Sequence, residues 1–303
     1  MKFNVPQGLS QPDPFMCQTE EGWAMYATSI EGVQAYSASE PFGPWQYEGI
    51  VFRMEGFHEY WAPCMYYERG TYYLYFSCRE IGSEVNRECL WVASSATPFG
   101  PFEKPKKLFG VFSIDPHVVK TDNGLFLWYC MDRTDTDRVG TRIFVQKMDS
   151  PETPIGEAVE SVVPSFDEEI FQKDRYQKGQ HWHTIEGPFW LQVDGWQYLM
   201  YSGACYQNDT YHIGYASAKT RESDLREITF EKHTDNGCFA PLMTKNDVEE
   251  GVGHHSVINW QGQYYAVYHA RDYKTYPELG EEQRTARICK LAFCDGIITK
   301  QWL

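Results

Sequence analysis

Hydrophobic positions along this chain fall in short runs and not at helical spacing. Aromatic and β-branched residues gather in these runs, and clusters of Gly, Pro, Asn and Asp separate them from one end of the chain to the other. The three-to-four-residue spacing of an amphipathic helix is nearly absent. Aromatic and β-branched residues suit strands, whereas Gly, Pro, Asn and Asp suit the turns between strands. The pattern therefore predicts an all-β protein.

One unit of this pattern recurs along the chain. Each copy has an opening motif, then a Gly-containing turn, and then an aromatic strand that ends near a tyrosine. The copies begin at residues 13–16 and 22–26, 61–66 and 70–75, 115–119 and 124–129, 186–189 and 195–201, and 253–257 and 262–268. Repeats of roughly 50 to 70 residues with three or four strands each are typical of propeller blades. We therefore predict a five-bladed β-propeller that forms a single domain over residues 1–303.

Three acidic residues, Asp13, Asp115 and Glu186, stand in the opening motifs of different units. The innermost strand of every propeller blade lines the central channel, so we expect these side chains to converge although they lie far apart in sequence. Carboxylates around one pocket repel one another as anions, which raises at least one pKa and separates their protonation states. A hydrolase needs this separation, because one carboxyl group must donate a proton while another accepts one.

The net charge of −15 narrows the choice of partner. It disfavours a nucleic acid or an anionic membrane and favours a neutral or cationic small molecule. No apolar run approaches the roughly 20 residues that span a bilayer, and the first residues lack the apolar core of a signal peptide. We therefore expect a cytoplasmic protein. The nine cysteines include no Cys-x-x-Cys pair, which predicts reduced thiols.

The opening motifs, taken in order, resemble glycoside hydrolase family 43. The matching motifs are Asp13-Pro14, Trp61-Ala62-Pro63, Asp115-Pro116-His117, Glu186-Gly187-Pro188 and the histidine of Gly251-Val252-Gly253-His254. The resemblance covers essentially the whole chain. It implies a five-bladed propeller that removes arabinofuranosyl or xylosyl units from plant polysaccharides with inversion at the sugar carbon.

The resemblance also implies roles for individual residues. Asp13 would be the general base that activates water, Glu186 the general acid that protonates the leaving oxygen, and Asp115 the residue that tunes the acid and orients the sugar. His254 would lie near a calcium ion or a water in the central channel, although calcium prefers oxygen ligands to imidazole. No cofactor is required, and a structural calcium is the metal expected. The family commonly carries an acidic residue directly after Trp-Ala-Pro, where this chain has Cys64.

Four further residues are candidates for substrate binding. Trp61 either walls the pocket or packs in a core between strands. Arg284 and Arg287 precede the last inner strand pattern, where the family often places a substrate-binding arginine. Arg284 fits the spacing better, and residues three apart in a strand point to opposite faces, so at most one should face the channel. His183 either bonds a sugar hydroxyl or belongs to a loop without a role in binding.

The combined expectation is an inverting exo-glycosidase that hydrolyses terminal α-L-arabinofuranosyl residues from arabino- or arabinoxylo-oligosaccharides. The alternatives within the same chemistry are a β-xylosidase and an endo-1,5-α-L-arabinanase, because pocket depth and loop walls decide the sugar. A carbohydrate-binding propeller without turnover is the alternative from another class. A propeller that transfers a sugar to phosphate would need a cationic cluster, of which the sequence offers little sign.

Overall fold

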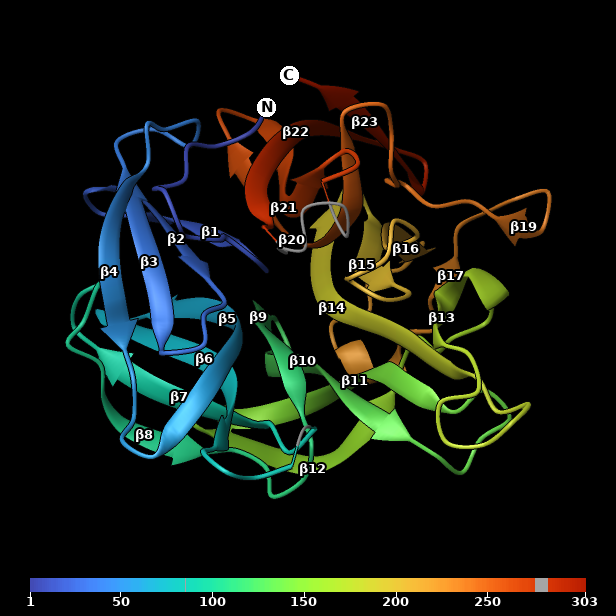
Figure 1. Ribbon diagram of the computed structural model, residues 1–303, viewed down its shortest axis with the longest axis horizontal. Helices are drawn as coiled ribbons and strands as arrows, with labels where there is room; N and C mark the ends of the chain where they lie inside the picture. The colour runs from blue at the N-terminus through green and yellow to red at the C-terminus, as the bar shows by residue number, and fades with distance from the viewer. Residues whose placement is uncertain (85, 276–282) are drawn as a thin grey trace.

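The computed structural model describes residues 1–84, 86–275 and 283–303, and strands dominate this part of the chain (Figure 1). Within it, the strands form five four-stranded antiparallel units, which Figure 1 shows arranged as propeller blades around a central axis. The expected all-β propeller is confirmed, and the arrangement of the strands is consistent with the expected five blades. None of the described residues belongs to a helix long and apolar enough to cross a bilayer.

Each blade is an antiparallel meander whose first strand lies nearest the axis (Figure 1). In chain order the blades are β1 (Phe15–Thr19), β2 (Gly22–Ala27), β3 (Val33–Ala38) and β4 (Gln46–Phe52); β5 (Phe57–Glu68), β6 (Thr71–Glu80), β7 (Cys89–Ser95) and β8 (Glu103–Lys107); β9 (Ile114–Thr121), β10 (Gly124–Arg133), β11 (Gly140–Ser150) and β12 (Thr153–Glu160); β14 (Trp182–Val193), β15 (Trp196–Gly203), β16 (His212–Ala218) and β17 (Glu231–Lys232); and β20 (Glu249–Trp260), β21 (Gln263–Asp272), β22 (Thr285–Cys294) and β23 (Ile297–Trp302). The remaining elements are β13 (Ile170–Gln172), the hairpin of β18 (Thr234–Asp235) and β19 (Cys238–Phe239), and the 3₁₀ helices η1 (Asp167–Glu169) and η2 (Leu225–Glu227).

The hydrophobic core of the described chain lies between the blades. Each cluster of buried apolar side chains joins two neighbouring blades, and one of them joins the fifth blade back to the first. Many of the tyrosines that make the chain rich in aromatic residues are used here. Rings that are less than 2% exposed include Tyr26, Tyr36, Tyr60, Tyr75, Tyr129, Tyr198, Tyr215 and Tyr268. The aromatic content is therefore explained largely by packing between blades.

The third and fourth blades are joined directly by backbone pairing. Strands β11 and β14 run parallel over a short stretch in which Gly140 pairs with His183 and Thr141 with Thr184. Gly140 has a φ of +144°, and a Cβ atom there would lie 1.8 Å from the carbonyl oxygen of His183. Only glycine permits so close an approach. This contact fixes the start of β14, the strand that carries Glu186.

The opening motifs share one backbone conformation. A positive φ between 34° and 59° occurs at Asp13, Ala62, Asp115, Gly187 and His254. Register shifts interrupt strand pairing beside this position in the second to fifth blades. A bulge of this kind bends the strand and redirects a side chain, which here brings the motifs together at the axis. The sequence places Asp13, Asp115 and Glu186 at comparable positions of their units, and this needs correction for Glu186. The residue equivalent to Asp13 and Asp115 is Gly187, and Glu186 stands one residue earlier.

The N-terminal segment closes the ring against the fifth blade. The Phe3 N–H donates to the Ala286 carbonyl at 2.9 Å, and the Ile288 N–H donates to the Met1 carbonyl at 2.9 Å. The Phe3 ring packs 5.5 Å from the ring of Trp45, in the cluster shared by the first and fifth blades. Figure 1 marks both chain ends beside the fifth blade.

Candidate active site

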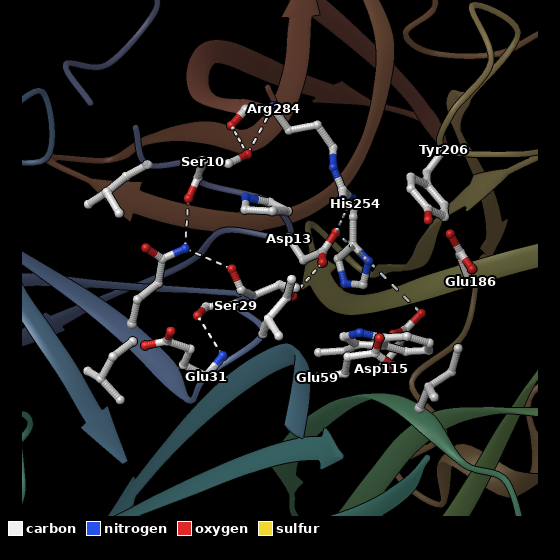
Figure 2. Close-up of a pocket in the computed structure, with 18 of the residues that line it drawn as sticks. Ser10, Asp13, Ser29, Glu31, Glu59, Asp115, Glu186, Tyr206, His254 and Arg284 are labelled. Carbon is white, nitrogen blue, oxygen red and sulfur yellow. Dashed lines mark hydrogen bonds and ion pairs between the residues drawn. The ribbon is translucent and has the colours of Figure 1, made fainter. Parts of the chain in front are cut away.

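A pocket of about 670 Å³ lies where the opening motifs converge (Figure 2). The three predicted acids, Asp13, Asp115 and Glu186, all line it, although 173 residues separate the first from the last in sequence. Trp61, His254 and Arg284 line the same pocket. The geometry expected of propeller blades therefore holds, and six of the eight predicted site residues meet in one cavity.

Asp13 is held by contacts from three directions. Its Oδ2 accepts a hydrogen bond from the Thr28 hydroxyl at 2.5 Å, and its Oδ1 lies 3.4 Å from Arg284 Nη1 and 3.2 Å from His269 Nδ1. Burial alone would raise the pKa of this carboxyl, but His254, Arg284 and His269 hold it well below its ordinary range. Burial also lowers the pKa of both imidazoles, so the Arg284 guanidinium is the permanent charge that keeps Asp13 anionic.

Asp115 has an environment of the opposite kind. Burial raises the pKa of its carboxyl, and the neighbouring Glu186 and Asp13 carboxylates raise it further. The Gly187 N–H donates to Asp115 Oδ2 at 2.9 Å and opposes this shift only in part. Because Gly187 directly follows Glu186, this hydrogen bond ties the third carboxyl group to the backbone that carries the second. The charge state of Glu186 therefore influences that of Asp115.

Glu186 is a carboxyl group that keeps its proton in slightly acidic solution. Burial raises its pKa to about 7, and the Asp13 carboxylate raises it as well. The Tyr211 hydroxyl donates to Glu186 Oε1 at 2.6 Å and acts in the opposite direction. Tyr211 is itself fully buried and stacks on His269, with ring centroids 5.8 Å apart. The pocket therefore combines one anionic carboxylate, which can accept a proton, with one carboxylic acid, which can donate one.

The two arginines separate as the sequence predicted. Arg284 points into the pocket, where it pairs with Asp13 and lies over the Tyr206 ring at 4.6 Å (Figure 2). Arg287 is absent from the pocket lining. It forms ion pairs with Glu249 at 3.0 Å and Asp272 at 2.7 Å within the fifth blade. Arg287 is thus committed to ion pairs outside the pocket.

Two other predicted positions lie outside the pocket. His183 is buried at the junction of the third and fourth blades, where its Nε2 lies 2.9 Å from Arg138 Nη1. It does not line the cavity, because its pairing with Gly140 fixes it between the blades. Cys64 is buried in the core between the second and third blades. All nine cysteines are free thiols, as expected.

His254 faces carboxylates. Its Nδ1 lies 3.5 Å from Asp13 Oδ1 and 4.0 Å from Asp115 Oδ2 (Figure 2). Among residues 1–84, 86–275 and 283–303, no group of three or more His, Cys, Asp or Glu side chains is arranged to hold a metal ion. The side chains present do not fit a calcium held by protein ligands, and the structural calcium stays a prediction.

Three supporting residues were missed from the sequence. Thr28 bridges two blades, because its hydroxyl donates to Asp13 and accepts from the Ala62 N–H at 2.7 Å. His269 and Tyr211 support Asp13 and Glu186 from across the pocket. Only His269 had a sequence feature that could have revealed it. His269 directly follows the tyrosine that ends the repeated aromatic strand of the fifth unit. Ser202 has the same position in the fourth unit, and its hydroxyl accepts a hydrogen bond from the His254 N–H at 2.7 Å.

Comparison with known proteins shows the family to which the chain is similar. The profile of "Glycosyl hydrolases family 43" matches residues 6–298. The "Extracellular exo-alpha-(1->5)-L-arabinofuranosidase ArbA" of Cellvibrio japonicus is 25% identical over 282 residues, which cover 85% of this chain and 78% of that protein. "Xylosidase/arabinosidase 43A" of Humicola insolens is 30% identical over 125 residues, which cover 38% of this chain and 37% of that protein.

Solved structures show the same similarity over almost the full length. A thermostable family-43 glycoside hydrolase superposes with a TM-score of 0.80 at 27% identity, over 100% of this chain and 96% of that chain. The α-L-arabinofuranosidase from Lactobacillus brevis superposes with a TM-score of 0.79 at 18% identity, over 96% and 93%. At that identity the second match concerns the fold alone.

One expectation is overturned by these comparisons. The cytoplasmic location rested on the absence of an apolar leader in the first residues, whereas the relative that matches 85% of the chain is named as an extracellular enzyme. The first residues of the sequence are not evidence for a location. The expectation of a cytoplasmic protein is contradicted by this relative and was wrong. The profile match, the full-length superposition and the paired carboxyl groups agree with one another, and the chain belongs to glycosyl hydrolases family 43 and is a glycoside hydrolase.

Proposed function

We propose that this chain is an inverting, exo-acting glycosidase that removes terminal α-L-arabinofuranosyl residues from arabinose-containing oligosaccharides. The observation that carries the proposal is the opposite protonation of Asp13 and Glu186 within one pocket. The arabinofuranosidase from Cellvibrio japonicus, similar over 85% of the chain, supports arabinose as the sugar. Its extracellular location supports a substrate outside the cell.

In the proposed mechanism, Asp13 is the general base. Its carboxylate takes a proton from a water molecule while the water oxygen bonds to the anomeric carbon of the sugar. Thr28 fixes the carboxylate by a hydrogen bond, and His254, Arg284 and His269 keep it anionic. A carboxylate with such a low pKa is a weak base, so its contribution comes from orienting the water as well as from accepting the proton.

Glu186 is the general acid in this mechanism. Its proton passes to the glycosidic oxygen as the bond between that oxygen and the anomeric carbon breaks. The pKa of about 7 keeps the proton in place in slightly acidic solution and on about half of the molecules at neutral pH. Asp115 assists by accepting the hydrogen bond from the Gly187 N–H, which fixes the backbone next to the acid, and the Asp13 carboxylate disfavours loss of the acid's proton. Water that attacks from the side opposite Glu186 gives inversion.

A β-xylosidase is the second candidate, because the relative from Humicola insolens is named for both xylosidase and arabinosidase activity. The deciding experiment measures hydrolysis of aryl α-L-arabinofuranoside and aryl β-D-xyloside at equal concentration across a pH series. Cleavage of the arabinofuranoside supports the proposal, and preference for the xyloside replaces it with the second candidate. Turnover of neither aryl glycoside, nor of arabinan or xylan fragments, would favour a carbohydrate-binding propeller.

A further inference from the structure

The pocket extends well beyond the three acids. Its volume of about 670 Å³ lies within the range of roughly 300–1,000 Å³ that encloses drug-sized ligands. One pentose would leave much of this space unfilled. The additional lining comes from the first blade and the segment before it, and includes Leu9, Ile30, Glu31, Tyr47 and Ile50. Tyr47 and Ile50 belong to β4, the outermost strand of that blade, so the cavity runs from the axis toward the edge of the molecule.

One wall of this extension joins the first two blades. The backbone of Ser29 exchanges two hydrogen bonds with that of Tyr60, at 3.1 and 2.9 Å, and the Glu59 N–H donates to the Ile30 carbonyl at 2.8 Å. The wall therefore carries Ile30, Glu31 and Glu59, and Trp61 lies two residues beyond Glu59. In Figure 2, Glu59 lies between Glu31 and Asp115 along the pocket. Backbone pairing makes this wall a fixed surface and not a free loop.

The Glu59 carboxylate is held in place and kept anionic. Its Oε2 accepts a hydrogen bond from Arg79 Nε at 2.6 Å, and this contact keeps the pKa of Glu59 below its ordinary value. Arg79 Nε also lies 3.1 Å from Glu88, but burial raises the pKa of Glu88 to about 7. Arg79 itself is fixed by donating to the Ser83 carbonyl at 2.7 Å. The cation that neutralises Glu59 thus lies behind the wall, while the carboxylate borders the cavity.

The wall combines two features that suit a sugar ring. Ile30 is 68% exposed and presents an apolar surface, which suits the C–H face of a ring. The carboxylates of Glu31 and Glu59 are acceptors for hydroxyl groups. The pKa values of Asp115 and Glu186 are raised and Asp13 is paired with Arg284, so the carboxylates that a ligand meets at this wall are those of Glu31 and Glu59. An anionic ligand is therefore repelled.

We propose that the wall formed by Ile30, Glu31 and Glu59 binds a second sugar unit of the substrate and selects neutral sugars over those that bear a carboxylate. This inference rests on the proposed function, because it assigns the first sugar to the site of Asp13 and Glu186. The enzyme then acts best on neutral pentose oligosaccharides of two or more units. Uronic acid substituents on the second unit weaken binding through repulsion by Glu31 and Glu59.

The test compares three substrates built on the sugar that the enzyme prefers. They are the aryl monoglycoside, a neutral trisaccharide, and the same trisaccharide with a uronic acid substituent on its second unit. We expect the wild-type protein to cleave the neutral trisaccharide at least tenfold more efficiently, in kcat/KM, than the substituted one. Glu59→Gln and Glu31→Gln should each reduce this ratio to about threefold or less. Each should also raise KM for the neutral trisaccharide about tenfold, the effect of losing one hydrogen bond to a charged group.

Two controls make the result specific. Glu103→Gln makes the same chemical change on the exposed strand β8 and should leave the ratio at its wild-type value. Glu31 is exposed and makes no ion pair with a described residue, so Glu31→Gln keeps the test decisive should Glu59→Gln unfold. A wild-type ratio near one, or a ratio unchanged in both pocket variants, overturns the second sugar site.

Calorimetric binding of the same trisaccharides separates the two proposals. Absence of cleavage with retained, neutral-selective binding overturns the proposed function and leaves the second sugar site standing. Cleavage of the aryl glycoside with no preference between the two trisaccharides, in binding or in turnover, overturns the second sugar site and leaves the function standing.

Discussion

Asp13 and Glu186 are both buried carboxyl groups, and their neighbours decide their different protonation. Asp13 is paired with a guanidinium, whereas Glu186 accepts its hydrogen bond from the neutral hydroxyl of Tyr211. A cation stabilises the charged form of a carboxyl group strongly, and one neutral hydrogen bond does not offset burial. The assignment of base and acid therefore follows from the different neighbours of the two carboxyl groups, with His254, Arg284 and His269 beside Asp13 and Tyr211 beside Glu186.

We predict that Asp13→Asn and Glu186→Gln each lower kcat by about 10²–10⁴ while the fold is kept, because each change removes a proton transfer but preserves shape. The wild-type rate should fall above about pH 7, where Glu186 loses its proton, and should persist far into acid, where Asp13 remains anionic. Initial rates across a pH series, with circular dichroism of each variant, check both points. A variant with wild-type rates would remove that residue from the mechanism.

Tyr211 offers a finer test of the acid. Its hydroxyl stabilises the charged form of Glu186 and so lowers the pKa of that carboxyl. We predict that Tyr211→Phe raises the pKa of Glu186 and moves the alkaline limb of the kcat profile up by about one pH unit, the equivalent of about 1.4 kcal/mol. Tyr215→Phe is the matched control, because that buried ring lies in the core between the fourth and fifth blades. A downward shift, or an equal shift in both variants, would contradict the role of Tyr211.

At the scale of the elements, the opening motifs explain how five blades build one site. Each opening motif has a residue with positive φ at the same place, and in the second to fifth blades the adjoining bulge turns the chain toward the axis. Aspartate tolerates this conformation better than most residues, and glycine tolerates it best. The Asp-Pro and Gly-Pro motifs of the sequence therefore indicate a backbone conformation as well as candidate catalytic residues.

Gly187 tests this geometry. It has a φ of +59°, and a Cβ atom there would lie 3.2 to 3.3 Å from atoms of the His254 ring. We predict that Gly187→Ala lowers the free energy of unfolding by about 1–2 kcal/mol through backbone strain, and lowers kcat by displacing His254 from Asp13. Gly110→Ala is the control, because the space around Gly110 is open and its φ is ordinary. Thermal unfolding and initial rates measure both effects, and equal behaviour of the two variants would refute the prediction.

The sequence predicted the parts of the site that repeat and missed the parts that cross between blades. Asp13 and Asp115 were found because each precedes a proline at the same place in a recurring unit. Tyr211 was not, because its contact with Glu186 joins residues 25 apart whose strands carry no common motif. His183 was placed at the site because it is close to Glu186 in sequence, but pairing with Gly140 directs it between blades. Side-chain contacts across blades depend on strand register, which the repeat pattern does not specify.

At the scale of the whole molecule, the pocket depends on a closed ring, because its lining comes from the first, second, third, fourth and fifth blades together. The N-terminal segment joins the first blade to the fifth, and Phe3 is 4% exposed in their shared core. Asp13 lies in the first blade and its partner Arg284 at the start of the fifth blade's third strand. Loosening of this junction is therefore expected to separate Asp13, the proposed catalytic base, from Arg284.

We predict that Phe3→Ala lowers the free energy of unfolding by about 3–5 kcal/mol, the usual cost of removing a buried phenylalanine. The change opens the junction that holds Asp13 and Arg284. Activity should therefore be lost at a lower urea concentration than the one at which the tyrosine and tryptophan fluorescence of the other blades changes. Ile81→Ala removes an apolar side chain that is 65% exposed and should change stability by no more than about 0.5 kcal/mol. Urea titrations followed by both signals make the comparison. If the two signals of Phe3→Ala change together, the ring opens as one cooperative unit and the junction is not its weakest point.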